Sequence, residues 1–381
     1  MKYFKFFILF LFPLTVLSCH DDDEDEIKTP TYKTTIMFMP WSTNLTPYFE
    51  QNIADIETVI NDGLLRNERI IVCISSKPRL ANVIELRPSQ RGCVRDTLLQ
   101  YEDPHFTKQE DITRMLVDVR RLAPASSYAL IVGGHGMAWL PNGRRAKDLR
   151  DEFLPQTRWF GGLTSNYQIA TTTLATAIKN AGMHMEYILF DDCYMSSVEV
   201  AYDLKDVTGK LIGCPTEILI YGFPYHLCAR HIFGAPDYAA LCQSFINFYA
   251  TYYTPCATIA VTDCGQIDAL AEIVRRINMG EKSSSFDLSN VQPMDGYYPT
   301  LFYDLGDYIN QICDDSSLLD EFNRQLAKTV PYKEYTEYYY SSLDGARHKI
   351  NAYSGITTSV LNPSSESSDG LEETEWYQAT H

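Results

Sequence analysis

Short apolar runs alternate with amphipathic stretches from about residue 33 onward. Runs rich in β-branched and aromatic residues predict buried strands at 35–39, 69–75, 128–132 and 186–190. Apolar positions at helical spacing predict helices over 47–64, 107–122 and 168–181, with Thr107 as the N-cap of the second. Because strands that are apolar on both sides are covered on both faces, this order predicts a mostly parallel α/β sheet flanked by helices.

The same layering is expected beyond residue 205. Residues 82–96 predict a hairpin, and later patterns predict strands at 210–213 and 257–262 and helices at 236–251 and 266–277. A less patterned stretch at 280–300 precedes two helical patterns, a tyrosine-rich run and a strand-like run at 303–314, 317–329, 335–340 and 355–361. We therefore expect a core over 33–280 and a C-terminal α+β addition over 281–381, packed on the core and ending in an exposed tail.

The N-terminal segment follows a different pattern. Lys2 and Lys5 precede an apolar run that is too short and one-sided for a stable membrane anchor, so residues 1–18 predict a secretory signal peptide. Residues 16–19 read Val-Leu-Ser-Cys, which resembles the lipobox of bacterial lipoproteins and implies a lipid on Cys19. We therefore expect a cell-envelope lipoprotein that contacts the membrane through this lipid.

Six consecutive acidic residues at 21–26 predict a solvated, flexible tether over 19–32. Such a run is equally typical of a plain spacer. It also resembles the acidic signals that send some Gram-negative lipoproteins to the outer face of the outer membrane. The second interpretation implies a surface-exposed protein of the outer membrane.

Composition narrows the function classes. The chain has 381 residues, 45% of them hydrophobic, and its net charge is −17, which excludes general disorder and disfavours nucleic acid as a partner. Of ten cysteines, the nine besides Cys19 form no CxxC pair, which disfavours a zinc ribbon or thioredoxin site. HExxH, P-loop, GxGxxG, GxSxG and EF-hand patterns are also missing, so the sequence predicts no metal and no cofactor.

Two predicted strands end in polar clusters, Gly134-His135-Gly136 and Asp191-Asp192-Cys193. The carboxyl ends of parallel strands lie on one edge of a sheet, so His135 and Cys193 are expected to meet there. A thiol beside an imidazole is the minimum apparatus for covalent acyl transfer. Taken separately, each residue is more typical of a structural role, as a satisfied turn histidine or a small buried cysteine. Because both lie at strand ends, together they favour catalysis.

The surroundings of the two residues extend this interpretation. The backbone amides of Gly136 and Cys193 are the expected oxyanion donors. A helical pattern over 196–204 predicts a helix start that lowers the thiol pKa. Asp192 acts in the opposite direction, because a second acid beside the thiol raises its pKa.

These motifs resemble those of the clostripain-like cysteine peptidases, relatives of caspases, gingipains and legumains. The family's histidine lies in a Gly-rich turn near a tryptophan, matched by His135 and Trp139. Its cysteine lies in an Asp-x-Cys segment followed by a methionine and a Glu-containing helix, matched by residues 191–199. Asn44-Leu45 and the strand end at 261–263 match further family positions. The resemblance covers roughly residues 33–365 and implies a caspase-like fold.

The resemblance also implies roles. Cys193 is the expected nucleophile and His135 the general acid and base of an endopeptidase that forms a thioester. Asp191 is expected in a substrate pocket for Arg or Lys, with Glu217 as a second candidate. Calcium dependence occurs among relatives. The alternative function is a catalytically silent, surface-anchored lipoprotein that binds glycans or host proteins through the same fold.

A basic segment lies between the two catalytic candidates. Relatives are often cut between the histidine and the cysteine, so we expect autoprocessing there, at Arg144, Arg145, Lys147 or Arg150. The alternative is a solvated loop that only balances charge.

Overall fold

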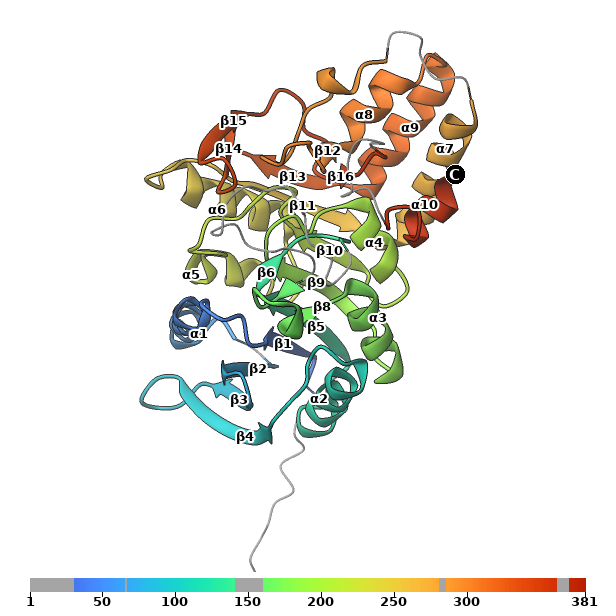
Figure 1. The fold of residues 1–381 in the computed structure, drawn as a ribbon. Helices are drawn as coiled ribbons and strands as arrows, with labels where there is room; N and C mark the ends of the chain where they lie inside the picture. The colour runs from blue at the N-terminus through green and yellow to red at the C-terminus, as the bar shows by residue number, and fades with distance from the viewer. Residues whose placement is uncertain (1–30, 66, 141–159, 281–285, 362–369) are drawn as a thin grey trace, which may run out of the picture. The chain divides into compact units, whose positions relative to one another are not determined.

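A nine-stranded mixed sheet runs through the computed structural model, which describes residues 31–65, 67–140, 160–280, 286–361 and 370–381 (Figure 1). Its strand order is β13-β11-β10-β9-β5-β1-β2-β3-β4. The five central strands are parallel: β10 (Lys210–Gly213), β9 (Met185–Asp191), β5 (Ser127–Gly133), β1 (Lys33–Met39) and β2 (Glu68–Lys77). The predicted α/β class with a parallel centre is confirmed.

Both edges of the sheet are antiparallel. The predicted hairpin is β3 (Leu80–Arg87) with β4 (Val94–Glu102), and it extends the sheet beyond β2. At the other edge, β11 (Thr258–Asp263) pairs antiparallel with β10, and β13 (Tyr332–Tyr335) pairs antiparallel with β11. The apolar pattern located β11 but not its direction, because direction depends on which end of the sheet the preceding connection reaches.

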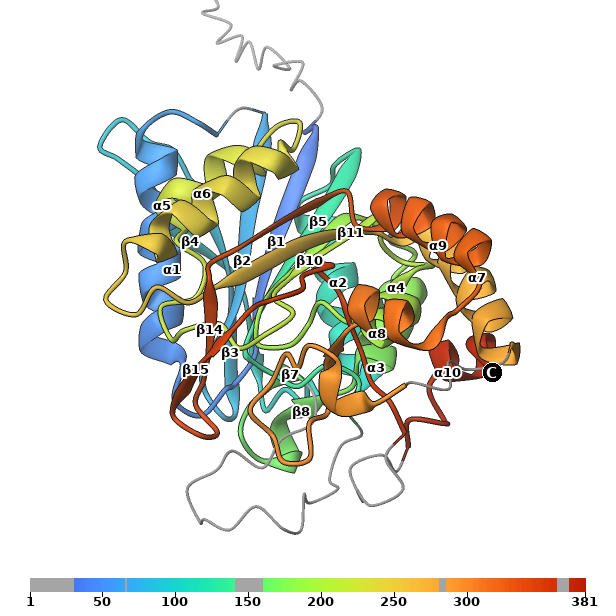
Figure 2. The same ribbon diagram turned by 90° about the horizontal axis from the view of Figure 1, so that it is seen from above.

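Helices cover both faces of the sheet, as Figure 2 shows. One face carries α1 (Thr46–Asn61), α5 (Tyr225–Cys228) and α6 (Tyr238–Ala250), and the other carries α2 (Gln109–Leu122), α3 (Thr171–Asn180), α4 (Val198–Leu204) and α7 (Ile267–Met279). Neighbouring residues of β1 belong to different buried clusters, Ile36 to the α2 side and Met37 to the α1 side. This two-sided burial explains the near-continuous apolar strands.

Several predicted boundaries need correction. Thr107 does not cap α2; the N-cap is Lys108, whose side chain makes no capping hydrogen bond. Helix α3 begins at Thr171, because residues 168 and 169 form β8 (Gln168–Ile169), which pairs with β7 (Phe160–Gly161). In the strand-like run at 355–361, only β16 (Thr357–Thr358) is a strand, and it pairs with β12 (Tyr303–Asp304).

The C-terminal part adds helices beside α7 and a hairpin near β13. Its remaining elements are α8 (Leu305–Ile312), α9 (Ser316–Thr329), β14 (Tyr338–Ser341), β15 (Ala346–Lys349) and α10 (Glu375–Thr380). The tyrosine-rich run is thus split between β13 and β14. None of the helices in the described ranges combines the length and the apolar character needed to cross a membrane.

Candidate active site

Two neighbouring strands place His135 and Cys193. In the pairing of β5 with β9, Gly133 lies opposite Asp191, and each candidate follows this pair by two residues. Both side chains line one cavity of ≈ 350 Å³ at the carboxyl edge of the parallel strands. The register of the sheet therefore brings together residues that are 58 positions apart in the chain.

Asn44, in the turn before α1, orients His135. The Nε2 of His135 lies 2.8 Å from the Oδ1 of Asn44. An amide oxygen accepts hydrogen bonds, so this contact places the proton on Nε2 and leaves Nδ1 as the free base. Burial lowers the pKa of His135 to about 4, because desolvation disfavours the imidazolium. At neutral pH His135 is therefore an uncharged base of defined tautomer.

Gly136 lets the two turns touch. A Cβ at this position would lie 2.4 Å from the carbonyl oxygen of Cys193 and 3.0 Å from its nitrogen, so no side chain fits. The Cys193 N–H has no hydrogen-bond acceptor among the residues that the structure describes. A close pair of backbone turns with a free amide fits the expected oxyanion donors, Gly136 and Cys193.

The Cys193 thiol lies in a negative environment. It is half-buried, and its Sγ lies 3.8 Å from the carbonyl oxygen of Ile218. Burial is the main cause that raises its pKa well above the ordinary value, followed by the charges of Glu217, Asp192 and Asp191. The expected effect of Asp192 is therefore confirmed in direction.

The expected lowering of the thiol pKa by a helix start is wrong. Helix α4 begins only at Val198, five residues after Cys193. Its first turn is already capped by Ser197, whose side chain accepts a hydrogen bond from the Val200 amide. The helix dipole acts within about one turn, so it does not offset burial at Cys193.

Asp191 lines the cavity beside Cys193. Its carboxylate accepts hydrogen bonds from the Phe223 amide (2.9 Å) and the Tyr225 hydroxyl (3.1 Å). Gly222 comes so close that a Cβ there would lie 2.6 Å from Asp191 Oδ1. Burial raises the pKa of Asp191 to about 7, because these two donors compensate only part of the desolvation.

Glu217 lines the same cavity and is bound by three donors. It accepts hydrogen bonds from the Tyr194 hydroxyl (2.8 Å), the Ser341 hydroxyl (2.6 Å) and the Ser342 amide (3.0 Å). These contacts join the turn after Cys193 to the end of β14. Glu217 thus connects the C-terminal hairpin to the candidate site.

The two family positions Trp139 and Glu199 meet at Ser359. The Trp139 indole donates to the Ser359 hydroxyl (2.9 Å), and Glu199 accepts from the Ser359 amide (2.9 Å). Glu199 is fully buried, which raises its pKa to about 7. These hydrogen bonds tie the end of the His135 turn to the helix that follows Cys193.

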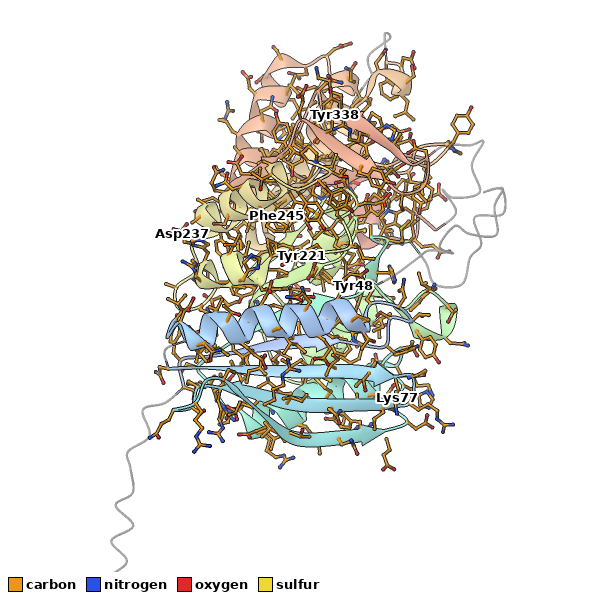
Figure 3. All side chains as sticks on the ribbon, turned by 90° about the vertical axis from the view of Figure 1, so that its left-hand side faces the viewer. Tyr48, Lys77, Tyr221, Asp237, Phe245 and Tyr338 are labelled. Carbon is orange, nitrogen blue, oxygen red and sulfur yellow. The ribbon has the colours of Figure 1, made fainter. Side chains whose placement is uncertain are left out.

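Aromatic and aliphatic side chains form the remaining walls of the cavity. Members include Tyr48, Leu219, Ile220, Tyr253, Tyr340 and Leu343, and none of the described lining residues is Lys or Arg. Figure 3 labels Tyr48 and Tyr221, which both line this cavity on the side of the molecule that carries α1. The resemblance to the family indicated the segment that carries Leu219 and Ile220, but the sequence did not predict the contributions of Tyr48, Tyr253 and Tyr340 or the contact of Asn44, because these segments lie far apart in the chain.

Five candidates of the sequence lie outside the described residues: Cys19, Arg144, Arg145, Lys147 and Arg150. In the described ranges, no three His, Cys, Asp or Glu side chains are grouped so that they could hold a metal ion.

Comparisons with known proteins give one consistent family. The model of the clostripain family, Peptidase C11, matches residues 38–369. A comparison with curated proteins finds no match. Among solved structures, a secreted C11 cysteine protease of Bacteroides thetaiotaomicron, "iotapain", is 48% identical, with a TM-score of 0.86 over 93% of this chain and 100% of that one.

Two further structures resemble the chain. An inactive zymogen C11 protease of Parabacteroides distasonis is 25% identical, with a TM-score of 0.81 over 93% of this chain and 99% of that one. A clostripain of Bacteroides thetaiotaomicron in complex with the peptide inhibitor BTN-VLTK-AOMK is 52% identical, with a TM-score of 0.56 over 58% of this chain and 99% of that one. The likeness to C11 proteases confirms the caspase-like fold.

Proposed function

Because the chain belongs to the clostripain family of cysteine peptidases, we propose that it is an endopeptidase that cleaves after Arg or Lys through Cys193 and His135. One observation carries this proposal: a single cavity holds the thiol, the imidazole and the buried carboxylate of Asp191. Protein or peptide chains are the corresponding substrates, and the inhibitor-bound relative was solved with a peptide.

The geometry supports a mechanism in which both groups start uncharged. The Sγ of Cys193 attacks the carbonyl carbon of the scissile bond while Nδ1 of His135 takes the thiol proton. The amides of Gly136 and Cys193 stabilise the oxyanion. The imidazolium then protonates the leaving amine as the C–N bond breaks, and water hydrolyses the thioester.

No step of this mechanism needs a metal, since the thiol and the imidazole supply the nucleophile and both proton transfers. We therefore propose activity without a cofactor. The same cleavage rate before and after treatment with a chelator supports this proposal, and restoration of a lost rate by calcium alone contradicts it.

Asp191 supplies the proposed preference for a basic residue before the scissile bond. A buried carboxylate gains most from a guanidinium or ammonium ion, which forms charge-assisted hydrogen bonds with it. Its raised pKa reflects an unpaired charge, and a bound cation provides the missing partner. The inhibitor sequence VLTK of the relative ends in lysine and is consistent with this role. Glu217 is the second candidate, although protein donors already bind it.

The N-terminal features give the proposed location. We propose a lipoprotein that is anchored through Cys19 at the outer membrane, which is the simplest use of a signal peptide followed by a lipobox. The relative "iotapain" is described as secreted. Cys19→Ala is expected to move the protein from the membrane fraction to the soluble fraction, and an unmodified N-terminus in mass spectrometry contradicts the anchor.

Autoprocessing in the segment 140–150 follows from the same specificity. A peptidase that prefers Arg or Lys meets four such residues in this segment, which lies between its two catalytic groups, and one relative is a zymogen. Purified protein is expected to yield two fragments with a new N-terminus within 145–151. Cys193→Ala should remain intact, and identical cutting of that variant would identify a contaminating protease instead.

A cleavage profile with a peptide library tests the proposed function. The protein is produced from Lys28 onward, which removes the lipid signal, and cleavage positions are read by mass spectrometry. Cleavage only after Arg and Lys, lost in Cys193→Ala, supports the proposal. Cleavage after other residues, or no cleavage by the processed protein, contradicts it.

A further inference from the structure

A second cavity lies at the same edge of the sheet. It has a volume of ≈ 630 Å³ and lies where β1, β2 and β4 end. Polar side chains line about half of it, and its aromatic and apolar part includes Trp41, Pro104, Phe106, Tyr167 and Ile169. Neither His135 nor Cys193 is among its lining residues, so it is distinct from the cavity described above.

This second cavity is close to His135. In the pairing of β6 (His135–Gly136) with β7, His135 lies opposite Gly161. The next residue, Gly162, packs so tightly that a Cβ there would lie 2.7 Å from the Trp41 carbonyl oxygen and 2.7 Å from the Tyr167 Cβ. With about 5 Å between paired strands and 3.8 Å between successive Cα atoms, the wall of the cavity begins roughly 10 Å from His135.

A short ridge separates the two cavities. Leu163 lines the first cavity and Tyr167 the second, and the Leu163 amide donates to the Thr43 hydroxyl (3.4 Å). Residues 41–44 run along this ridge. Trp41 at one end lines the second cavity, and Asn44 at the other end contacts His135. His135 therefore lies on the side of the first cavity that borders this ridge.

The direction of proton transfer tells which part of a substrate faces the second cavity. The leaving amine must lie beside His135, because this residue protonates it. The half of the substrate that stays on Cys193 occupies the first cavity with Asp191. The leaving half therefore starts at His135 and points away from that cavity.

We propose that the second cavity binds the leaving half of the substrate and accepts a large aromatic side chain there, against Trp41 and Tyr167. This inference rests on the proposed function. At about 3.3 Å per extended residue, a separation of roughly 10 Å corresponds to the second or third residue after the scissile bond. The charges of Arg79 and Asp103, which line this cavity, do not select the substrate side chain. These two residues are already paired with each other through hydrogen bonds of 2.7 and 2.8 Å.

Three substrates test this proposal. The first carries an arginine followed directly by a small fluorogenic amine. The other two are matched peptides that continue for three residues after the arginine, one with Phe and one with Gly at the second and third positions. We expect the Phe peptide to be cleaved with a kcat/KM about tenfold higher than the Gly peptide, as typical for filling an apolar subsite.

Two variants and a control locate the effect. Trp41→Ala removes one wall, and Asn166→Trp fills the cavity from an exposed position on its rim without removing a core side chain. Both are expected to reduce the Phe-to-Gly ratio to about one. Tyr332→Ala, which removes an exposed aromatic side chain on β13, should leave the ratio unchanged.

The outcomes separate this inference from the proposed function. Cleavage of the fluorogenic substrate together with equal rates for the Phe and Gly peptides overturns the inference alone. A Phe preference that persists in both Trp41→Ala and Asn166→Trp also overturns it. Failure to cleave any arginyl substrate contradicts the proposed function instead.

Discussion

The turns that carry His135 and Cys193 leave adjacent strands at the same height, yet their electrostatic surroundings differ. The histidine turn consists of glycines and one amide partner, and desolvation is the cause that lowers its pKa to about 4. The cysteine turn contains Asp191 and Asp192 and faces Glu217, and these charges add to burial in raising the thiol pKa.

Burial is thus the main cause that keeps both groups of the resting pair uncharged. Only the thiol also has nearby carboxylates, which add to the effect of burial. A cationic substrate side chain changes only the second turn, since it pairs with Asp191 and reduces the negative potential at Sγ. We therefore expect a basic residue before the scissile bond to raise kcat as well as lower KM.

The largest expected effect comes from removing either turn's reactive group. Cys193→Ala and His135→Ala should each reduce kcat/KM by about 10⁴-fold or more, because the nucleophile and its base act as one unit. Rates are measured with an arginyl substrate, and thermal unfolding confirms that both variants fold. Residual cleavage in both variants would show that another pair of residues is responsible.

The second-largest effect is expected at Asp191, a carboxylate of the cysteine turn that has no counterpart in the histidine turn. Asp191→Asn should reduce kcat/KM for arginyl substrates about 10²-fold, because it removes the charge that pairs with the guanidinium. In the unmodified protein, Asp191 has a raised pKa of about 7, so it is protonated below and charged above this pH. The kcat/KM should therefore rise with pH through about 7.

The matched control is Glu217→Gln, which retains the size of the second carboxylate in the cavity. We expect a loss of less than tenfold and an unchanged rise through pH 7. An Asp191→Asn variant with the same pH profile and the same Arg preference as the unmodified protein would contradict the assignment.

A smaller effect is expected in the histidine turn. Asn44→Ala should lower kcat about tenfold with little change in KM, because the imidazole loses the partner that fixes its tautomer. Asn44→Asp retains an acceptor and adds a charge that raises the pKa of His135, so it should restore rate while moving the acidic limb of the kcat profile to higher pH. An acidic limb that stays in place would limit Asn44 to a structural role.

The smallest effect is expected at Asp192. Its carboxyl is fully buried beside the thiol, and burial together with the charge of Asp191 raises its own pKa well above the ordinary value. Asp192→Asn therefore removes little negative charge at neutral pH, and alkylation of Cys193 by iodoacetamide should change less than about threefold. A much faster reaction in this variant would mean that Asp192 carries its charge at neutral pH.

The sequence predicted the chemistry of the two turns better than their electrostatics. Apolar runs located β5 and β9, and the pairing of parallel strand ends then placed His135 near Cys193. The pKa of the thiol was harder to predict, because it depends on burial and on Glu217, which is 24 residues away in the chain. The same limit applies to Asn44, whose contact with His135 spans 91 residues.

The sequence predicted the fold correctly where a strand has apolar residues on both sides. The prediction was wrong where the secondary structure of a segment depends on its pairing partner. Helix α1 and the central strands followed the local pattern closely. The short strand β8 replaced a predicted helical turn, because residues 168 and 169 pair with β7. Two-residue strands have no periodicity of their own, so only their partners reveal them.

Covalent labelling tests the central claim most directly. The protein is treated with an active-site-directed thiol reagent that carries an arginyl or lysyl group, and the adduct is mapped by mass spectrometry. We predict one label per chain, on Cys193 alone among the ten cysteines, with strongly reduced labelling in His135→Ala. A label on another cysteine, or equally fast labelling by a glutamyl reagent, would contradict the account.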